Sequence, residues 1–546
     1  MRDVLGLMQE TPLTVNLVFQ RGRQYWGARE IVTKTVDGVE RSTFAATADE
    51  ILVLAAALDG LGLAPDARVG TFGWNTRHHL LTYFAVPMTG RVLHTGNIRL
   101  FPEQFAYTVE HADDRVMFVD RSLLPLFAKY LPLLTTVEHV VVFDDGAPHE
   151  LPDDPRVIRY EDLVAGVAPA DPDELAARVT EENTACGLCY TTGTTGNPKG
   201  VLYSHRSTYL HAAAAMYANT LGLTDADTVM PVVPMFHANA WGIPYAAWLA
   251  GATMVMPGPD MTPAGLLDRI VDEKVTVTAG VPTIWMGMVP LLEGRDVSSL
   301  RRVMSGGSAM PRALSQKWLD ATGQPMMQGW GMTEISPVGS QSLLRAEYLD
   351  ADAEAQMDIR VTAGMAVAGL EWRVVSPETG EAQPWDGESS GELEIRGPWV
   401  ARQYYRTDEP GTQFSPDGWL RTGDVAVISP DGYMKIVDRT KDLVKSGGEW
   451  ISSVDLENEI MAMPGVAEAA VIGVPHPKWS ERPLAIVVPA SEGSVSRDDV
   501  LDFLRTRVSS WQLPDDVVFV EEIPKTSVGK FSKKTLRERF GDHQLS

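Results

Sequence analysis

Residues 190–205 read YTTGTTGNPKGVLYSH, and this stretch decides how the rest of the chain is interpreted. Four threonines and two glycines fall between positions 191 and 196, and a lysine follows at position 199. Glycines let backbone amides converge on an anion, and threonine hydroxyls add donors and metal ligands. The stretch therefore predicts a phosphate-holding loop, although a flexible surface turn would have a similar composition.

The loop is not a Walker A motif. Counted from Gly193, Pro198 stands where that motif needs its second glycine. The surrounding pattern also differs, because an apolar run, ACGLCY (185–190), precedes the loop and a short predicted strand, GVLYS (200–204), follows it. Only then is a helix expected, with Ser204 as its N-cap.

Length and composition bound the answer further. A chain of 546 residues is too long for one core, so two or more domains are expected. The composition is that of a soluble globular protein, with 44% hydrophobic and 22% charged residues. A formal net charge of -25 argues against non-specific nucleic-acid binding, so no nucleic-acid partner is expected. An anionic substrate would need a local positive site or a metal ion.

Short apolar runs alternate with helical periodicity through the first 430 or so residues, which predicts parallel, doubly wound sheets. The runs at 68–74, 115–120, 139–143, 253–258 and 276–282 are predicted buried strands. A strand-rich and turn-rich β subdomain is expected from about 365 to 437, and a small α+β unit with three strands and two helices after 443. The predicted fold class is α/β. The predicted boundaries are a large N-terminal domain at 1–437, a hinge at 438–443 and a small, mobile C-terminal domain at 444–546.

The two cysteines, Cys186 and Cys189, could form a redox pair. They lie in an apolar strand, where residues three apart point to opposite faces, so two inert core cysteines are the preferred interpretation. The absence of further cysteines excludes a disulfide framework and fits a reducing compartment. No signal peptide is recognisable at the N-terminus, and a cytoplasmic location is expected.

Residues 232–256 carry no Asp, Glu, Lys or Arg and are long enough to span a bilayer. Pro234, Pro244, His237 and Asn239 interrupt the run. We therefore predict a buried strand, loop, helix and strand in a large core, and no transmembrane segment.

Six motifs in order carry a resemblance to a known family. TTGTTGNPKG (191–200), GGSAMP (306–311), QGWGMTE (328–334), GWLRTGD (418–424), DRTKDLVKSGGEWIS (438–452) and PKTSVGK (524–530) closely resemble the signatures of the adenylate-forming enzymes. This superfamily includes acyl-CoA synthetases, adenylation domains and luciferases. The resemblance covers essentially the whole chain and is strongest to the fatty acyl-CoA synthetase branch.

The resemblance implies a reaction in two halves, with ATP, Mg²⁺ and the co-substrate CoA. A carboxylate attacks the α-phosphorus of ATP to give acyl-AMP and pyrophosphate, and the CoA thiol then displaces AMP. Catalysis in the first half should come from positioning and charge neutralisation. The implied magnesium ligands are Thr191 and Glu334.

The resemblance also assigns further site residues, among them Asp424, which follows RTG at the end of a predicted strand. The implied catalytic residues are Lys530, Glu334, Thr191 and His237. The implied nucleotide-binding residues are Thr191, Thr192, Gly193, Thr194, Thr195, Gly196, Lys199, Gly307, Ser308, Gln328, Gly329, Trp330, Thr333, Asp424, Arg439, Lys441, Lys445 and Trp450. The implied acyl and pantetheine contacts are His237, Ala238, Trp241 and Gly448, although a core histidine and a core tryptophan are an equally good interpretation of His237 and Trp241.

Two of these residues imply a moving domain. Lys530 would bridge the attacking carboxylate and the α-phosphate, and Lys441 would be the pivot that withdraws Lys530 before CoA enters. At position 330 the family commonly has a tyrosine, so the tryptophan of this chain leaves the shape of the adenine pocket open.

The sequence predicts an ATP-dependent ligase for a medium- or long-chain fatty acid and CoA. The alternatives are a CoA ligase for a short thioether acid such as methylthiopropionate, a ligase for an aryl or steroid acid, an acyl-AMP ligase that loads a carrier protein, and a nucleotide-binding module without catalysis. A luciferase-type oxidation is formally open on the same scaffold. A homodimer is a weaker expectation.

Overall fold

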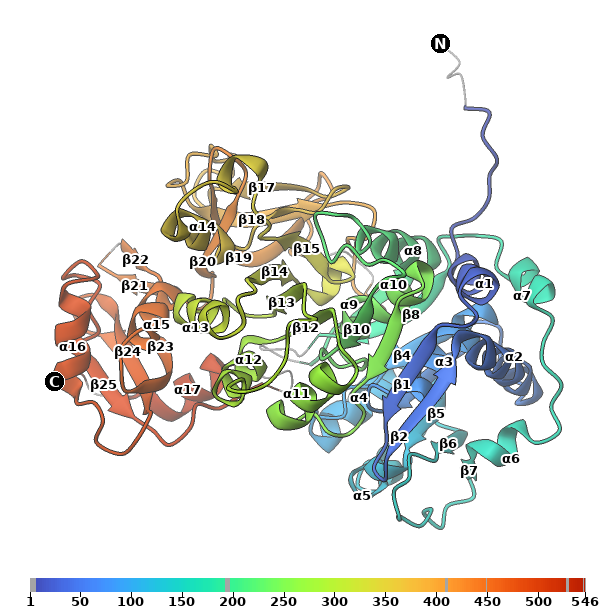
Figure 1. The fold of residues 1–546 in the computed structure, drawn as a ribbon. Coiled ribbons are helices and arrows are strands. Elements are labelled where there is room, and N and C mark those ends of the chain that lie inside the picture. Colours follow the sequence, from blue (N-terminus) through green and yellow to red (C-terminus); the bar gives the residue numbers. More distant parts are fainter. Residues whose placement is uncertain are drawn as a thin grey trace.

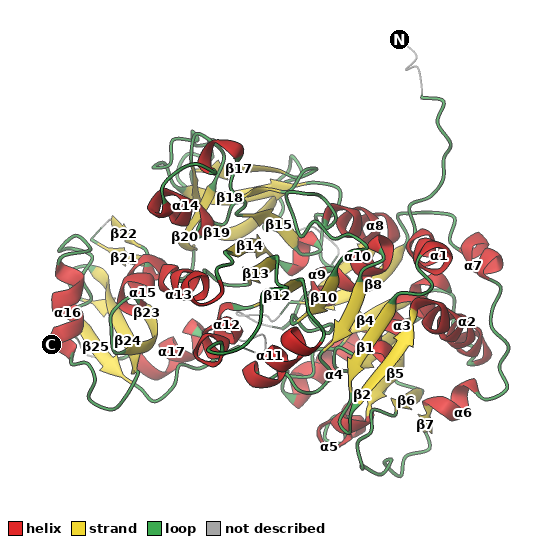
Figure 2. Ribbon diagram, viewed as in Figure 1, coloured by secondary structure: helices red, strands yellow, loops and turns green. Residues whose placement is uncertain are grey.

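The computed structural model describes residues 6–191, 197–407, 411–447, 449–526, 530–543 and 545. The chain forms a large body built on two sheets, an adjoining β subdomain, and a small C-terminal domain that lies to one side (Figure 1). Strands and helices alternate through the large body, as the sequence predicted (Figure 2). The α/β fold class is confirmed.

A seven-stranded sheet forms one layer of the large body. Its order is β7-β6-β5-β3-β4-β8-β9, and every pair is parallel except β8 with β9. Its strands are β3 (Arg68–Phe72), β4 (Val92–Thr95), β5 (Asp114–Asp120), β6 (His139–Phe143), β7 (Val157–Arg159), β8 (Ala185–Tyr190) and β9 (Gly200–Ser204). The threonine-rich loop thus joins two antiparallel neighbours at the sheet edge.

A nine-stranded sheet forms the second layer, in the order β16-β15-β14-β13-β12-β10-β11-β1-β2. The run from β14 to β1 is parallel, and antiparallel strands extend it at both edges. Its strands are β1 (Glu30–Lys34), β2 (Val39–Thr43), β10 (Thr228–Pro231), β11 (Thr253–Met256), β12 (Val277–Gly280), β13 (Arg302–Gly306), β14 (Met326–Gly331), β15 (Val338–Gln341) and β16 (Met365–Ala366).

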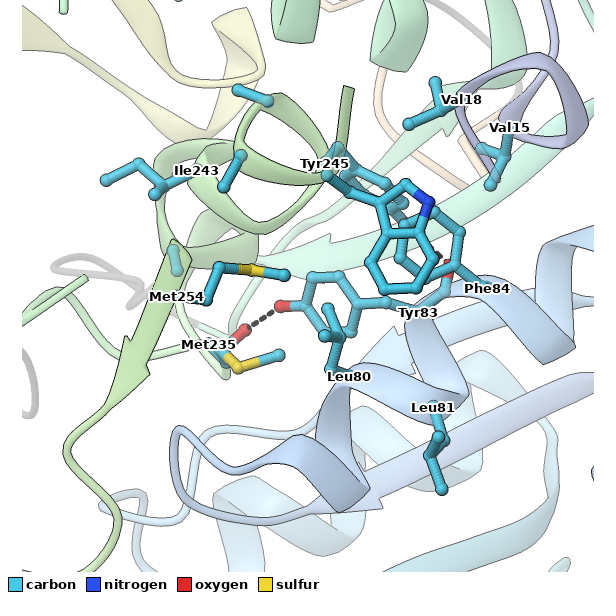
Figure 3. Packing of buried hydrophobic residues seen from close by; sticks show 14 of the residues in the cluster. Val15, Val18, Leu80, Leu81, Tyr83, Phe84, Met235, Ile243, Tyr245 and Met254 are labelled. Carbon is cyan, nitrogen blue, oxygen red and sulfur yellow. Dashed lines mark hydrogen bonds between the residues drawn. The ribbon is translucent and has the colours of Figure 1, made fainter. Parts of the chain in front are cut away.

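One hydrophobic core joins the two sheets through helices packed between them. Figure 3 shows part of this core, where the Tyr83 hydroxyl donates to the carbonyl of Met235 at 2.6 Å. The helices are α1 (Val15–Tyr25), α2 (Phe44–Gly60), α3 (Arg77–Met88), α8 (His205–Ala214) and α10 (Ile243–Ala250). The uncharged segment 232–256 is therefore buried protein core. The strand predicted at its start was wrong, because β10 ends at Pro231 and the segment begins with a loop; its helix and its second strand are α10 and β11 (Thr253–Met256). Among the described residues no helix is both long and apolar enough to cross a bilayer.

The outer faces of the sheets carry separate cores. Helices α4 (Pro102–Ala112) and α5 (Leu124–Phe127) cover the seven-stranded sheet. Helices α11 (Pro263–Asp272), α12 (Pro282–Met288) and α13 (Arg312–Thr322) cover the nine-stranded sheet. The remaining helices of the large body are α6 (Tyr160–Val164), α7 (Pro172–Arg178), α9 (Ala238–Trp241) and α14 (Ala353–Arg360).

The β subdomain is a four-stranded antiparallel sheet in chain order. Its strands are β17 (Glu371–Val375), β18 (Gly391–Arg396), β19 (Leu420–Ile428) and β20 (Met434–Arg439). Strand β20 extends to Arg439, so the first two residues of the predicted hinge segment are paired within this sheet.

The small domain is more elaborate than the three strands and two helices expected for it. A five-stranded sheet contains β21 (Val444–Ser446), β22 (Glu449–Ile451), β23 (Val466–His476), β24 (Ser480–Pro489) and β25 (Asp516–Phe519). Helices α15 (Ser453–Met461) and α16 (Arg497–Arg505) cover one face, and α17 (Lys533–Phe540) covers the other. The prediction missed α17 because its sequence, KKTLRERF, is mostly charged and has few apolar residues to mark a periodicity.

Candidate active site

The small domain delivers Lys530 to the end of strand β13 in the large domain. A Cβ atom built on Gly307, the residue after β13, would lie 3.4 Å from Cε of Lys530. The Lys530 backbone is held by Thr526, whose hydroxyl accepts from the amide of Lys530 at 3.2 Å and whose amide donates to its carbonyl at 2.6 Å. Two residues some 220 positions apart in the chain therefore meet at one point, which the sequence order of the motifs did not show directly.

The surroundings of Lys530 make its proton easier to lose. Burial and the positive charge of Arg439 lower the pKa of the Lys530 ammonium to about 8, against the opposing effect of Asp424 and Glu334. Lys530, Arg439, Asp424 and Glu334 therefore lie close enough in space for their charges to interact. An ammonium group with this pKa is charged at neutral pH and can neutralise an anion placed beside it.

Two side chains bind the carboxylate of Asp424. The indole nitrogen of Trp330 donates to one carboxylate oxygen at 2.8 Å, and Nε of Arg439 lies 3.2 Å from the other. Only 6% of Asp424 is exposed. The sequence analysis placed Asp424 at the end of a strand, and this was wrong: it lies inside β19 and pairs directly with Arg439 of β20. The cross-strand pairing explains why these two residues meet.

Glu334 lies in a 3₁₀ turn, Thr333–Ile335, directly after β14. The Tyr404 hydroxyl donates to its carboxylate at 2.6 Å. Burial raises the pKa of Glu334, while Tyr404, Arg439 and Lys199 oppose that rise. The ammonium of Lys199 lies 4.6 Å from the centre of the Tyr404 ring, so Tyr404 links the lysine of the threonine-rich loop to the predicted metal ligand.

Thr191 and Lys199 mark the two ends of the predicted phosphate loop. The amide of Thr191 donates to the carbonyl of Lys199 at 2.9 Å, and the Thr191 hydroxyl accepts from the Lys199 amide at 3.1 Å. These bonds close the base of the loop. The predicted contacts Thr192, Gly193, Thr194, Thr195 and Gly196 lie outside the described residues.

The donors near this loop suit magnesium. Magnesium is usually held by one or two carboxylates, with water and phosphate oxygens completing its shell. The single carboxylate of Glu334 and the hydroxyl of Thr191 are hard oxygen donors of this kind. No larger cluster of His, Cys, Asp and Glu that could hold a metal by itself occurs in the described part of the chain.

Strands β13 and β14 end side by side in glycines. Gly306 pairs with Gly329. A Cβ atom on Gly306 would lie 2.8 Å from the Trp241 ring, and a Cβ atom on Gly329 would lie 2.1 Å from the methyl group of Met304. Side chains are excluded at both positions, because Trp241 packs against Gly306 and Met304 packs against Gly329. Beyond them Ser308 is exposed.

Gln328 and Trp330 support this strand end from behind. The side-chain oxygen of Gln328 accepts from the amide of Met310 at 2.9 Å, which holds the loop after β13. The Trp330 ring packs on Gly339, where a Cβ atom would lie 2.5 Å from it. The larger ring is thus accommodated by a glycine on the neighbouring strand β15. Thr333 is buried and its carbonyl accepts from the Tyr203 hydroxyl at 2.7 Å.

A left-handed turn brings Trp241 to the same place. Ala238, Asn239, Ala240 and Trp241 have φ values of 42°, 53°, 49° and 56°. L-residues disfavour this conformation by about 1–2 kcal/mol each, so the surrounding core must hold the turn in place. The turn sets the Trp241 ring over Gly306 and near Gly307.

His237 precedes this turn and lies close enough to Lys530 to be affected by its charge. Burial, Lys530 and Arg99 lower the pKa of the His237 imidazole to about 3. His237 is therefore neutral at physiological pH. Its ring N–H can donate a hydrogen bond to a bound carboxylate without adding a second positive charge.

Two further residues assigned to the nucleotide, Lys445 and Trp450, lie on the β21–β22 hairpin of the small domain. Lys445 and Trp450 face each other across the β21–β22 hairpin, with the ammonium 5.5 Å from the ring centre. In Figure 1 that hairpin lies at the upper end of the small domain, and α17 lies at its lower end, beside α12 of the large body. Gly448 lies outside the described residues. Lys441, the predicted pivot, is exposed as a whole residue, and the partial burial of its ammonium together with the positive charge of Arg439 lowers its pKa.

Tyr404 and Tyr203 were missed by the sequence analysis. Tyr404 lies 70 positions after Glu334 in an irregular stretch, and Tyr203 occupies an ordinary strand position. No spacing rule links them to the site. Tyr203 lies inside the stretch YTTGTTGNPKGVLYSH, which is the only hint to it, and nothing in the sequence marks Tyr404.

Cys186 and Cys189 are inert, as predicted. Both are free and buried, and burial raises the pKa of each thiol, to about 12 and about 11. A thiol at that pKa is not a nucleophile at neutral pH.

The comparisons with known proteins agree with this geometry. Residues 19–405 match the profile of the AMP-binding enzymes, and residues 455–530 match that of the AMP-binding enzyme C-terminal domain. The 3-methylmercaptopropionyl-CoA ligase of Ruegeria pomeroyi is 44% identical, with 99% of each chain covered. The long-chain-fatty-acid–CoA ligase of Thermus thermophilus is also 44% identical, over 98% of this chain and 97% of that protein.

A solved structure supports the same arrangement. The anthranilate CoA ligase AuaEII, crystallised with anthranoyl-AMP, matches with a TM-score of 0.84 and 26% identity, and 98% of each chain is covered.

Proposed function

The chain belongs to the family of AMP-binding enzymes, and we propose that it is a ligase that activates a medium- or long-chain fatty acid as acyl-AMP and transfers the acyl group to CoA. The observation that carries the proposal is the approach of Lys530 to Gly307 from another domain. Such a lysine can neutralise charge on a carboxylate and on a phosphate placed between it and Asp424.

Each neighbouring group has a part in this proposal. Asp424 and Arg439 hold the ribose, the glycine ends of β13 and β14 accept the adenine, and Lys199 faces the outer phosphates. His237, neutral because of its low pKa, orients the acid carboxylate. Magnesium, bound by Glu334 and Thr191 together with phosphate oxygens, would neutralise charge on the polyphosphate.

A second class of acid is also a candidate substrate. The relatives named above act on a short thioether acid and on long-chain fatty acids at the same level of identity, so the short-acid ligase is the second candidate. A cytoplasmic location and a homodimer stay predictions of the sequence analysis.

The test is consumption of the CoA thiol with ATP and magnesium across free acids from short to long chains, with pyrophosphate release measured in parallel. The proposal expects thiol loss to peak with medium or long chains. A peak with short or thioether acids would keep the chemistry and change the substrate. Pyrophosphate release without thiol loss would indicate a carrier protein as acceptor, and no reaction in either assay would contradict catalysis.

A further inference from the structure

A continuous chain of hydrogen bonds connects the large domain to the helix that follows Lys530. The ammonium of Lys533, the first residue of α17, donates to the Ser453 hydroxyl at 2.5 Å and bonds Glu457 at 2.7 Å. The Ser453 hydroxyl and amide donate in turn to the carboxylate of Asp438, at 2.5 and 2.7 Å. Asp438 belongs to β20 of the β subdomain, whereas the other three belong to the small domain.

These groups are buried, so their bonds are not weakened by water. Asp438 is 1% exposed and Ser453 is fully buried. Burial raises the pKa of Asp438 and of Glu457, and the Lys533 ammonium opposes the rise in both. Burial alone would lower the pKa of Lys533, but Glu457 and Asp438 outweigh it and the pKa is raised. The charged forms of Asp438, Glu457 and Lys533 are therefore stabilised by the opposite charges of their neighbours in the network.

Asp438 and Arg439 are adjacent in β20, so their side chains point to opposite faces of the strand and contact different partners. Arg439 pairs with Asp424 at the nucleotide end, and Asp438 holds the N-terminus of α15. Two further bonds join the same elements: Ser452, the N-cap of α15, donates to the carbonyl of Val437 at 2.6 Å, and Lys435 pairs with Asp455 at 3.0 Å. The orientation of α15 is thus tied to the strand that carries Arg439.

A short segment, residues 530–533, links Lys530 to the network, and hydrogen bonds hold this segment in place. Ser532 caps α17, and its amide donates to the carbonyl of Pro524 at 2.7 Å. Lys530 precedes Lys533 by three residues and is itself fixed by Thr526. A shift of the first turn of α17 relative to β20 would therefore move Lys530 relative to Gly307 and Asp424.

We propose that Asp438, Ser453 and Lys533 are positioning residues that set Lys530 for the first half-reaction. The proposal rests on the proposed function, in which acyl-AMP formation needs Lys530 in the cleft and thioester formation needs it withdrawn. The bonds from Asp438 to Ser453 cross the proposed hinge, so they oppose any rotation of the small domain about Lys441. The network favours acyl-AMP formation and must open before CoA reacts.

The two half-reactions separate this role from a purely structural one. In Asp438→Asn and Ser453→Ala, acid-dependent exchange of pyrophosphate into ATP should fall by about tenfold to a hundredfold, the range expected for a hydrogen bond to a charged group. Thioester formation from preformed acyl-AMP should be unchanged or faster. The matched control is Asp516→Asn, since Asp516 bonds Arg497 and His543 within the small domain alone, and it should leave the ratio of the two rates unchanged. An equal fall of both rates in Asp438→Asn, or no fall in either, would overturn the proposal.

A second measurement does not depend on activity. Trypsin can cleave after Arg439 and Lys441, and the bonds from Asp438 hold the segment that contains both. In Asp438→Asn, but not in Asp516→Asn, cleavage at these two sites should be faster in the free protein at unchanged thermal stability. An unchanged cleavage rate would reject the positioning role, while wild-type protein that forms no acyl-AMP with any acid would reject the proposed function instead.

Discussion

The indole nitrogen of Trp330 donates a hydrogen bond of 2.8 Å to the carboxylate of Asp424, while Arg439 holds the other carboxylate oxygen. An ionised carboxylate has about four acceptor positions, so Asp424 can still accept two ribose hydroxyls. The tryptophan at position 330 is therefore an added anchor for the residue assigned to the ribose, and Gly339 provides the space for its ring.

Trp330→Phe removes this donor and keeps an aromatic ring. Because a hydrogen bond to a charged group is lost, the KM for ATP should rise about tenfold, with a smaller change in kcat. ATP saturation curves measure this directly. Trp385→Phe is the control, since Trp385 is 45% exposed on the β subdomain, and it should leave the KM unchanged. Equal KM values for wild type and Trp330→Phe would contradict the anchoring role.

Lys530→Ala tests the two-state mechanism. Removing one preorganised charge from the cleft should lower acyl-AMP formation by about a hundredfold to a thousandfold. Thioester formation from preformed acyl-AMP should persist, because the second half-reaction does not use this ammonium. Pyrophosphate exchange and thioester formation are measured separately, and an equal loss in both would refute the mechanism.

The pH dependence of the first half-reaction follows from the low pKa of Lys530. The ammonium, not the neutral amine, is the active form, and burial brings its pKa to about 8. Acyl-AMP formation should therefore fall as the pH rises through about 8, whereas a solvated lysine would keep its charge to above pH 10. His237 has a pKa of about 3 and should add no inflection between pH 5 and 7. A flat rate from pH 7 to 10 would contradict the assignment.

Tyr404→Phe tests the link between the loop and the predicted metal ligand. The change deletes the 2.6 Å bond to Glu334 and keeps the ring that faces Lys199. We expect the magnesium concentration for half-maximal rate to rise about tenfold, because the Glu334 carboxylate loses its orientation. Tyr405→Phe, at the next position, is the matched control. An equal rise in the half-maximal magnesium concentration of both variants would mean that the Tyr404 hydroxyl has no specific role.

Trp241→Ala tests the acyl side of the cleft. The Trp241 ring covers Gly306 from a strained left-handed turn, so its removal opens space at the end of β13. The profile of activity against acid chain length should change, while the KM for ATP stays within about twofold of wild type. A chain-length profile identical to that of wild type would return Trp241 to the role of an ordinary core residue.

Several elements could be predicted because one local rule governs each of them. The alternation of apolar runs with helical periodicity identified β3, β5, β6, β11 and β12 at nearly their observed bounds. Ser204 was expected as an N-cap, and it forms a capping box with Ser207 at the start of α8. Such features depend on neighbours within a few residues, so they can be predicted from the sequence directly.

Other features depend on pairings between distant segments and could not be predicted in this way. Asp424 was expected at a strand end, yet the register of β19 with β20 places it inside the strand and opposite Arg439. Helix α17 lacks an apolar stripe, and its position comes from packing on the small sheet and from Lys533. Tyr404 joins Glu334 only because an irregular stretch returns to the end of β14.

The sequence by itself determined the family, through six motifs in order, and predicted the lysine, aspartate and glutamate that would act on the nucleotide. Only the tertiary structure decided which of these groups lie close together. The low pKa of Lys530 and the neutrality of His237 arise from burial and from charges brought together across two domains. The two bonds to Asp424 arise because β14, β19 and β20 meet at that residue. Electrostatic effects depend on distance in space, and a linear order of residues does not contain that distance.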